Sequence, residues 1–274
     1  MLPRQIRRSP IKFTMSGIKI GGKRPVQTPI APKARAISTV LPLSGNKVYC
    51  FWTGDNPLTP NRKRNLDKST KFLRNQGIEL ILITPKNLDE YVRKIGTPLH
   101  PGYQYLSYTH RADYLRCYFM HFLGGGYTDI KDVAGNWRKA FSDLEGAPDK
   151  YMNGYQEVSP RGVTACYNDP EMRKILVANW RLLVGNGCYI FLPRTPLTTE
   201  WYDGLIKCMD KKYEQLVKYP ARHPREGHQD GYDPNYKYPV AWFEILGDIF
   251  HPLCYKYHTR LLKTCPLFNP GPYR

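Results

Sequence analysis

The architecture of this chain is set by residues 107–133, which read SYTHRADYLRCYFMHFLGGGYTDIKDV. Apolar residues recur at three- and four-residue steps through the first half: Ala112, Leu115, Phe119 and Phe122. This period predicts an amphipathic helix with one side packed against a core. Asp113, Arg116 and Met120 share another side of that helix, which we expect to be an exposed edge.

The second half of this stretch predicts a sharp turn and a short strand. Three consecutive glycines, 124–126, stop the helix, since glycine enters left-handed conformations without steric cost. β-favouring residues then resume with Tyr127, Thr128, Ile130 and Val133, and they predict a strand that carries Asp129 out of the sheet, with Asp132 in the loop just beyond.

Earlier segments alternate between strand and helix patterns. A nearly continuous apolar run at 47–54 and another at 78–84 predict buried strands, and 60–76 and 87–95 predict helices. The alternation indicates an α/β fold whose mainly parallel sheet has helices on both faces. Ligands of such sheets bind beyond the carboxyl ends of the strands, where Trp52, Thr53 and Asp129 are expected.

The second half of the chain is less informative. We expect a helix over about 198–217, a long loop over 219–238, and an amphipathic helix from Trp242 to His251. Glu244 and Asp248 would lie one turn apart on that last helix, and we interpret them as a solvated face.

The pattern RADYLR followed by GGGYTDIKD resembles the DxD-motif glycosyltransferase family. That family includes fungal mannosyltransferases, capsular polysaccharide synthesis enzymes and the glucosylating domains of large bacterial toxins. Its motif ends Gly-Gly-x-Tyr-x-Asp-x-Asp, whereas Lys131 stands at the last position here, a variant similar to those of large algal viruses. The resemblance is strong over 105–140 and looser over 47–97.

The resemblance implies a Rossmann-like GT-A fold and a retaining transferase that moves a hexose or deoxyhexose from a nucleoside-diphosphate sugar to a glycan or another hydroxyl acceptor. Trp52 would stack on the base, with Thr53 beside it, unless the indole belongs to the core. Asp113 and Arg116 would bind the donor sugar and phosphate and act in catalysis, with Arg111 nearby. The alternative for Asp113 and Arg116 is a helix-surface salt bridge.

Asp129 is the predicted catalytic and metal-binding carboxylate. Mn²⁺ or Mg²⁺ takes oxygen ligands from one or two carboxylates and from substrate phosphates, and neutralises the departing diphosphate. With Lys131 in the motif, two hypotheses remain open. Either Asp132 supplies the second carboxylate, which we favour, or the donor-binding Lys131 ammonium partly replaces the metal.

Charge is distributed unevenly along the 274 residues. The net charge is +18, and residues 1–40 contain nine basic and no acidic residues, together with five prolines. We therefore predict a basic flexible arm over 1–40 and a single domain over 41–274. The arm could contact polyanions or a membrane surface. Two other functions stay open, a polyanion- or nucleic-acid-binding protein and a catalytically inactive transferase-like module.

No apolar run is long enough to span a bilayer. The seven cysteines are odd in number and never form a CxxC pair, so neither a structural zinc site nor a disulfide framework is expected. These features favour a cytoplasmic protein, in the host cytoplasm if the protein is viral.

Overall fold

The central strand β1 (Lys47–Phe51) forms from the nearly continuous apolar run KVYCF, which is buried from Val48 onward. The structure, a computed structural model, describes residues 45–228 and 235–272. The predicted basic arm at 1–40 lies outside the described residues. β1 continues through Trp52–Pro57 into helix α1 (Pro60–Arg74), where the Thr59 hydroxyl accepts a hydrogen bond from Arg62 N and caps the first turn.

Parallel strands flank β1 on both sides. After α1, the chain turns at Gly77 and enters β2 (Glu79–Ile83), which pairs with β1 in parallel. It then passes through α2 (Leu88–Ile95), the 3₁₀ helix η1 (Pro101–Tyr105) and α3 (Tyr108–Phe122). The next strand, β3 (Gly125–Thr128), pairs in parallel with the opposite edge of β1.

The remaining strands make the sheet mixed. β5 (Val184–Phe191) is antiparallel to β3 and to β4 (Met152–Gln156), and β6 (Leu261–Leu262) is parallel to β4. The order of the six strands is β2-β1-β3-β5-β4-β6. The predicted α/β class is confirmed. The sheet is mainly parallel, as predicted, except that β5 runs antiparallel to both of its neighbours.

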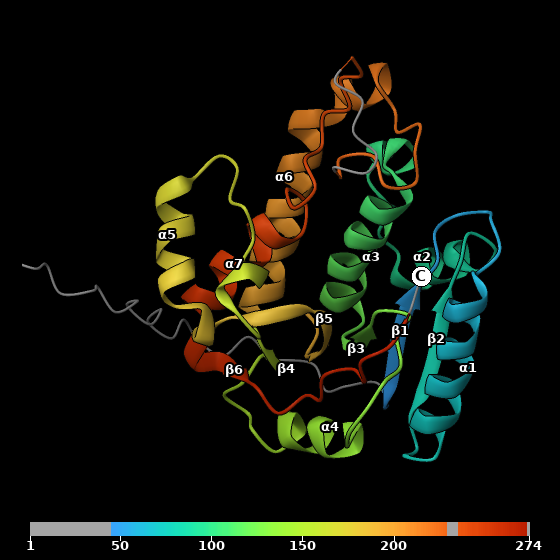
Figure 1. Ribbon diagram of the computed structural model, residues 1–274, viewed down its shortest axis with the longest axis vertical. Helices are drawn as coiled ribbons and strands as arrows, with labels where there is room; N and C mark the ends of the chain where they lie inside the picture. The colour runs from blue at the N-terminus through green and yellow to red at the C-terminus, as the bar shows by residue number, and fades with distance from the viewer. Residues whose placement is uncertain (1–44, 229–234, 273–274) are drawn as a thin grey trace, which may run out of the picture.

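Helices cover both faces of this sheet (Figure 1). One apolar cluster joins the sheet to α3, α6 (Pro196–Lys218) and α7 (Gly247–Lys256). A second cluster on the other face joins it to α1 and α4 (Trp137–Glu145). Helix α5 (Pro170–Ala178) packs beside α7. None of the helices in 45–228 and 235–272 is long and apolar enough to cross a membrane.

Helix α3 is buried on nearly all sides, which corrects the expected exposed edge. Met120 is fully buried, and Asp113 is 4% exposed. The reason is that α6 and η1 pack around α3 on the sides that the sheet leaves open. The helix starts at the predicted place because the Ser107 hydroxyl accepts a hydrogen bond from His110 N.

The three glycines form less of a turn than the sequence suggests. Gly124, with φ of 65°, makes the turn, whereas Gly125 and Gly126 already belong to β3. A Cβ on Gly126 would lie 2.8 Å from Val48 Cγ2 and 3.3 Å from the Trp137 ring. Glycine is therefore required there because β3 lies tightly against its neighbours. The strand ends at Thr128, so the prediction that Asp129 itself lies on this strand is wrong, and Asp129 is the first residue after it.

The segment around α7 also differs from the prediction. Residues 242–246 form turns, and α7 starts only at Gly247. Glu244 Oε1 lies 2.9 Å from Lys212 Nζ. The Asp248 carboxylate accepts hydrogen bonds from Cys166 N at 2.8 Å and from Tyr167 N at 3.2 Å. The interpretation of Glu244 and Asp248 as a solvated face is wrong, because packing against α6 and the 163–167 loop gives each carboxylate a partner.

Candidate functional site

Polar side chains gather where β1 and β3 end side by side. The strand that follows β1 in the chain, β2, lies on one side of β1, and β3 lies on the other side. The gap between the ends of β1 and β3 is therefore a topological switch point, which is where ligands of α/β sheets bind. A cavity of about 400 Å³ opens there. Its polar and aromatic lining comes from distant segments: Trp52, Thr53, Arg62, Tyr108, Arg116, Tyr127, Asp129, Lys131, Arg225 and Trp242.

Asp129 is held by three donors at the floor of the cavity. Its Oδ1 accepts hydrogen bonds from the Tyr127 hydroxyl at 2.6 Å and from Arg116 Nη2 at 3.1 Å. Its Oδ2 lies 2.9 Å from Lys131 Nζ. Arg116 also donates from Nη1 to Asn186 O at 3.1 Å and lies over the Tyr127 ring at 4.6 Å. We refer to Arg116, Tyr127, Asp129 and Lys131 as the Asp129 cluster.

The cluster keeps Asp129 ionised. Burial alone would raise the pKa of this carboxyl, but Arg116 and Lys131 outweigh it and hold the pKa below its usual value. The Asp129 and Lys131 side chains remain 23% and 28% exposed, so their charged ends still face the cavity. The cluster therefore presents one net positive charge to a ligand.

Asp113 lies behind this cluster. Its Oδ1 is 3.7 Å from Arg116 Nη2, and the residue is not among those that line the cavity. Burial raises the pKa of the Asp113 carboxyl to about 6, against a smaller opposing effect of Arg116. The structure thus brings Asp113 and Arg116 together inside the molecule, rather than as the surface salt bridge considered from the sequence.

Trp52 and Thr53 form one rim of the cavity, directly after β1. The Trp52 indole is half-buried, lines the cavity and donates from Nε1 to Asn56 O at 2.6 Å. Arg62 of α1 lies 5.2 Å from its ring. The Thr53 hydroxyl donates to Tyr108 O at 2.5 Å, which ties the end of β1 to the start of α3. Trp52 is therefore not a core residue, which was the alternative considered from the sequence.

The opposite rim comes from residues that the sequence did not single out as site residues. Pro224 and Arg225, from the predicted long loop, line the cavity together with Trp242. Thr109 N and the Thr109 hydroxyl both donate to Pro224 O, at 3.1 and 3.2 Å, and these two hydrogen bonds fix the loop against α3. Arg225 lies 5.6 Å from the Trp242 ring. No local sequence pattern predicts that these residues line the cavity, because their positions depend on packing between segments far apart in the chain.

Arg111 lies apart from the cavity lining. Its Nη2 donates to Gln104 O at 2.5 Å, and its guanidinium lies 5.8 Å from the Tyr103 ring and 5.4 Å from the Tyr108 ring. Arg111 and Arg116 are five positions apart on α3, a rotation of about 140° around the helix axis, so Arg111 faces η1 while Arg116 faces the strand ends. The structure brings Arg116, but not Arg111, into the lining.

The structure does not bring Asp132 together with Asp129. Asp132 Oδ2 lies 3.7 Å from Lys68 Nζ, and Asp132 lines a separate hollow beside α1. Asp129 is the one carboxylate among the described residues that line the 400 Å³ cavity, and both of its oxygens already face cationic groups. The donors present thus do not fit a two-carboxylate metal site. The predicted dependence on Mn²⁺ or Mg²⁺ stays a prediction.

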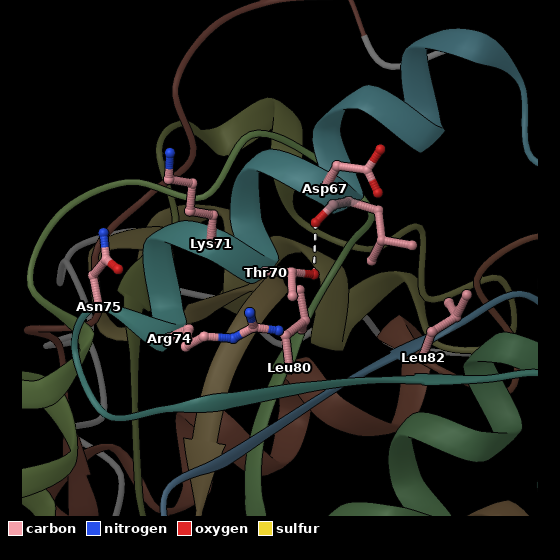
Figure 2. A pocket seen from close by; sticks show the side chains of 8 residues that line it. Asp67, Thr70, Lys71, Arg74, Asn75, Leu80 and Leu82 are labelled. Carbon is pink, nitrogen blue, oxygen red and sulfur yellow. Dashed lines mark hydrogen bonds between the residues drawn. The ribbon is translucent and has the colours of Figure 1, made fainter.

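A second hollow lies on the outer side of α1 and β2 (Figure 2). It measures about 530 Å³ and is more open to solvent than the cavity at the strand ends. The Thr70 hydroxyl donates to Leu66 O at 2.8 Å, and Asp67 pairs with Lys63 at 3.2 Å across an exposed helix turn. In Figure 2 the charged ends of Asp67 and Lys71 point away from one another. These side chains do not converge on a common point, so this hollow is the weaker candidate.

The chain was compared with models of protein families, with curated proteins and with solved structures, and no match was found. The geometry of the Asp129 cluster and its cavity therefore carries the functional argument.

Proposed function

We propose that this protein is a GT-A glycosyltransferase that moves a hexose or deoxyhexose from a nucleoside-diphosphate sugar to a glycan or another hydroxyl acceptor, with retention of configuration. One observation carries the proposal. A half-buried indole, Trp52, and the positively charged Asp129 cluster line a single cavity at the switch point of an α/β sheet. An aromatic face and fixed cations are the groups that recognise a base and a diphosphate.

Each part of the cavity has a role in this proposal. Trp52 stacks on the base, and Thr53 holds the strand end against α3. Arg116 and Lys131 bind the diphosphate, while Asp129 orients both cations and accepts a hydrogen bond from a donor hydroxyl. Asp113 is a positioning residue in this scheme, because it contacts Arg116 at 3.7 Å and does not line the cavity.

The transfer step requires little of the protein beyond charge and position. The bond from the anomeric carbon to the β-phosphate oxygen breaks, and its electron pair stays on the diphosphate. The oxygen of the acceptor hydroxyl bonds to the same face of that carbon, and its proton passes to the departing diphosphate. The cations of the cavity stabilise the negative charge that develops on the leaving group. An NMR assignment of the product's anomeric configuration tests retention, and an inverted product contradicts it.

Asp129→Asn tests the proposal directly. We expect UDP, GDP, UDP-glucose or GDP-mannose to raise the melting temperature of the wild-type protein, since a ligand that binds the native state stabilises it. We expect this shift to be lost in Asp129→Asn, because the amide no longer orients Arg116 and Lys131. Sugar transfer should fall by at least about a hundredfold.

Asp132→Asn is the matched control, since Asp132 follows in the same loop but lines another hollow. It should keep the ligand-induced shift. If none of the four probes, with or without Mn²⁺, stabilises the wild-type protein, the transferase proposal fails.

A second candidate function is the binding of a polyanion such as a nucleic acid. Two cation–aromatic pairs, Arg62 with Trp52 and Arg225 with Trp242, flank the cavity and resemble the mixture of charge and stacking that single strands require. Binding of single-stranded DNA or RNA that weakens steeply with salt, with no effect of nucleotide sugars on melting, would favour this function over transfer. If neither class of ligand binds, an inactive transferase-like module remains.

A further inference from the structure

Lys131 occupies the part of the cavity where a divalent cation would meet both Asp129 and a diphosphate. Its Nζ lies 2.9 Å from Asp129 Oδ2, and the other oxygen of Asp129 is already bound by Tyr127 and Arg116. An ion that coordinated Asp129 from the cavity side would have to displace this ammonium group. The carboxylate is thus already neutralised by a side chain.

The charges support the same conclusion. Two aspartates and a divalent cation cancel one another, and so do Asp129 and Lys131. With Arg116 added, each set carries one net positive charge, so the exchange of an aspartate for Lys131 leaves the net charge that faces a diphosphate unchanged. A second carboxylate facing the cavity would cancel the net positive charge that Arg116 and Lys131 leave there. Asp132 does not add this charge, because it is paired with Lys68 outside the cavity.

The loop that carries Lys131 is fixed from three directions. Ser69 of α1 donates from its hydroxyl to Lys131 O at 2.9 Å and accepts from Val133 N at 3.1 Å. Asn269 N donates to Asp132 O at 2.9 Å. The Phe268 ring lies 4.6 Å from Lys131 Nζ, at the end of the chain. The ammonium group is therefore held in place before a ligand arrives, as an effective electrostatic catalyst must be.

We propose that the Lys131 ammonium group takes the place of the divalent cation at the donor diphosphate, so that donor binding and transfer proceed without Mn²⁺ or Mg²⁺. This inference rests on the transferase function proposed above. Lys131 then neutralises the charge left on the β-phosphate oxygen when the bond to the anomeric carbon breaks. Lysine suits this role because its ammonium is a compact point charge with three donors.

The test compares three proteins with and without metal: wild type, Lys131→Ala and Lys131→Asp. Affinities for UDP and GDP are measured by calorimetry in EDTA and again in excess Mn²⁺, and turnover is measured with UDP-glucose and GDP-mannose. We expect the wild-type affinity and turnover to be the same in both buffers. Lys131→Ala should bind at least about tenfold more weakly and turn over about a hundredfold more slowly.

Lys131→Asp is the decisive variant, because it places a second carboxylate two residues after Asp129. We expect it to bind the diphosphates only in Mn²⁺, since without metal two carboxylates would repel the ligand. Lys71→Ala is the matched control: it removes a lysine of α1 that lines the outer hollow and not the cavity, so affinity and metal independence should be unchanged. Circular dichroism of each variant verifies folding. Lys131→Gln replaces Lys131→Ala, and Lys131→Glu replaces Lys131→Asp, if that variant does not fold.

The outcomes separate this inference from the function on which it rests. If wild-type protein binds or turns over only in Mn²⁺, or if Lys131→Ala binds as tightly as wild type, the metal-replacing role of Lys131 is overturned while the transferase function stands. If none of the nucleotides binds in either buffer, the transferase function itself is overturned.

Discussion

Asp113 and Asp129 both lie close to Arg116, yet their surroundings shift their pKa values in opposite directions. Asp129 faces two cations and a hydroxyl donor, so its pKa falls despite burial. Asp113 has burial as its dominant influence, and its pKa rises to about 6. Geometry explains the difference: Arg116 Nη2 is 3.1 Å from Asp129 but 3.7 Å from Asp113, and Lys131 Nζ lies 2.9 Å from Asp129.

Asp113→Asn should therefore change how stability depends on pH. The folded pKa of Asp113, about 6, lies above its ordinary value of 3.8, so the folded state binds the proton more tightly than the unfolded state. Its favourable contribution is complete below the lower value and is lost as pH rises through 6. Relative to wild type, the variant should thus gain up to about 3 kcal/mol between pH 4 and pH 7.

Urea unfolding of wild type and variant at each pH measures this difference. Asp132→Asn serves as the control, since it removes a carboxylate that pairs with an exposed lysine, and its difference from wild type should stay nearly constant. A difference between Asp113→Asn and wild type that is constant from pH 4 to pH 7 would contradict the raised pKa.

At the scale of the element, β3 decides where the Asp129 cluster lies. This strand has four residues, GGYT, and two of them have no side chain, so it fits tightly between β1 and β5. Gly125 has φ of 82°, and a Cβ there would lie 2.8 Å from the backbone oxygen of Lys47. The close approach brings Tyr127 and Asp129 to the end of β1.

Gly125→Ala should destabilise the protein by about 3 kcal/mol, because left-handed strain and a backbone clash add together. Gly96→Ala separates the two causes. Gly96 ends α2 with φ of 77°, but nothing lies within 4 Å of its Cβ position, so only strain of about 1 kcal/mol is expected. Equal free energies of unfolding for the two variants would mean that the close approach of β3 to β1 costs nothing.

At the scale of the whole molecule, the last described residues of the chain lie against helix α1. The C-terminal segment runs from β6 back across the sheet toward α1, as Figure 1 shows. Asn65 Nδ2 donates to Pro272 O at 3.2 Å, and Phe268 lies between Lys131 and Gly187. Residues more than 130 positions apart thus hold the same loop of the cavity.

Phe268→Ala should lower the free energy of unfolding by about 2 kcal/mol and weaken the binding of UDP or GDP, because Lys131 loses the ring that restrains it. Leu267→Ala is the neighbouring control, since Leu267 is 43% exposed, and its effect should stay within about 0.5 kcal/mol. Melting curves with and without nucleotide measure both effects. Tighter nucleotide binding by Phe268→Ala than by wild type would contradict this role of the C-terminal segment.

Local patterns predicted the elements that build the crevice. Continuous apolar runs indicated β1 and β2, and the period of apolar residues indicated α1 and α3, with ends within a few residues of those observed. They could not show that α3 is buried on nearly all sides, because this burial depends on packing against η1 and against α6, which starts only at Pro196. For the same reason the antiparallel direction of β5 was not foreseen.

The sequence by itself determined the strand-to-helix order, the end of α3 before Gly124 and the position of Asp129 close to a strand, because these depend on interactions between near neighbours in the chain. Tertiary structure alone decided that Asp132 pairs with Lys68, that Arg111 faces η1, and that Arg225 and Trp242 complete the cavity. Side-chain direction and distant partners depend on how whole elements pack, and no local pattern encodes that packing.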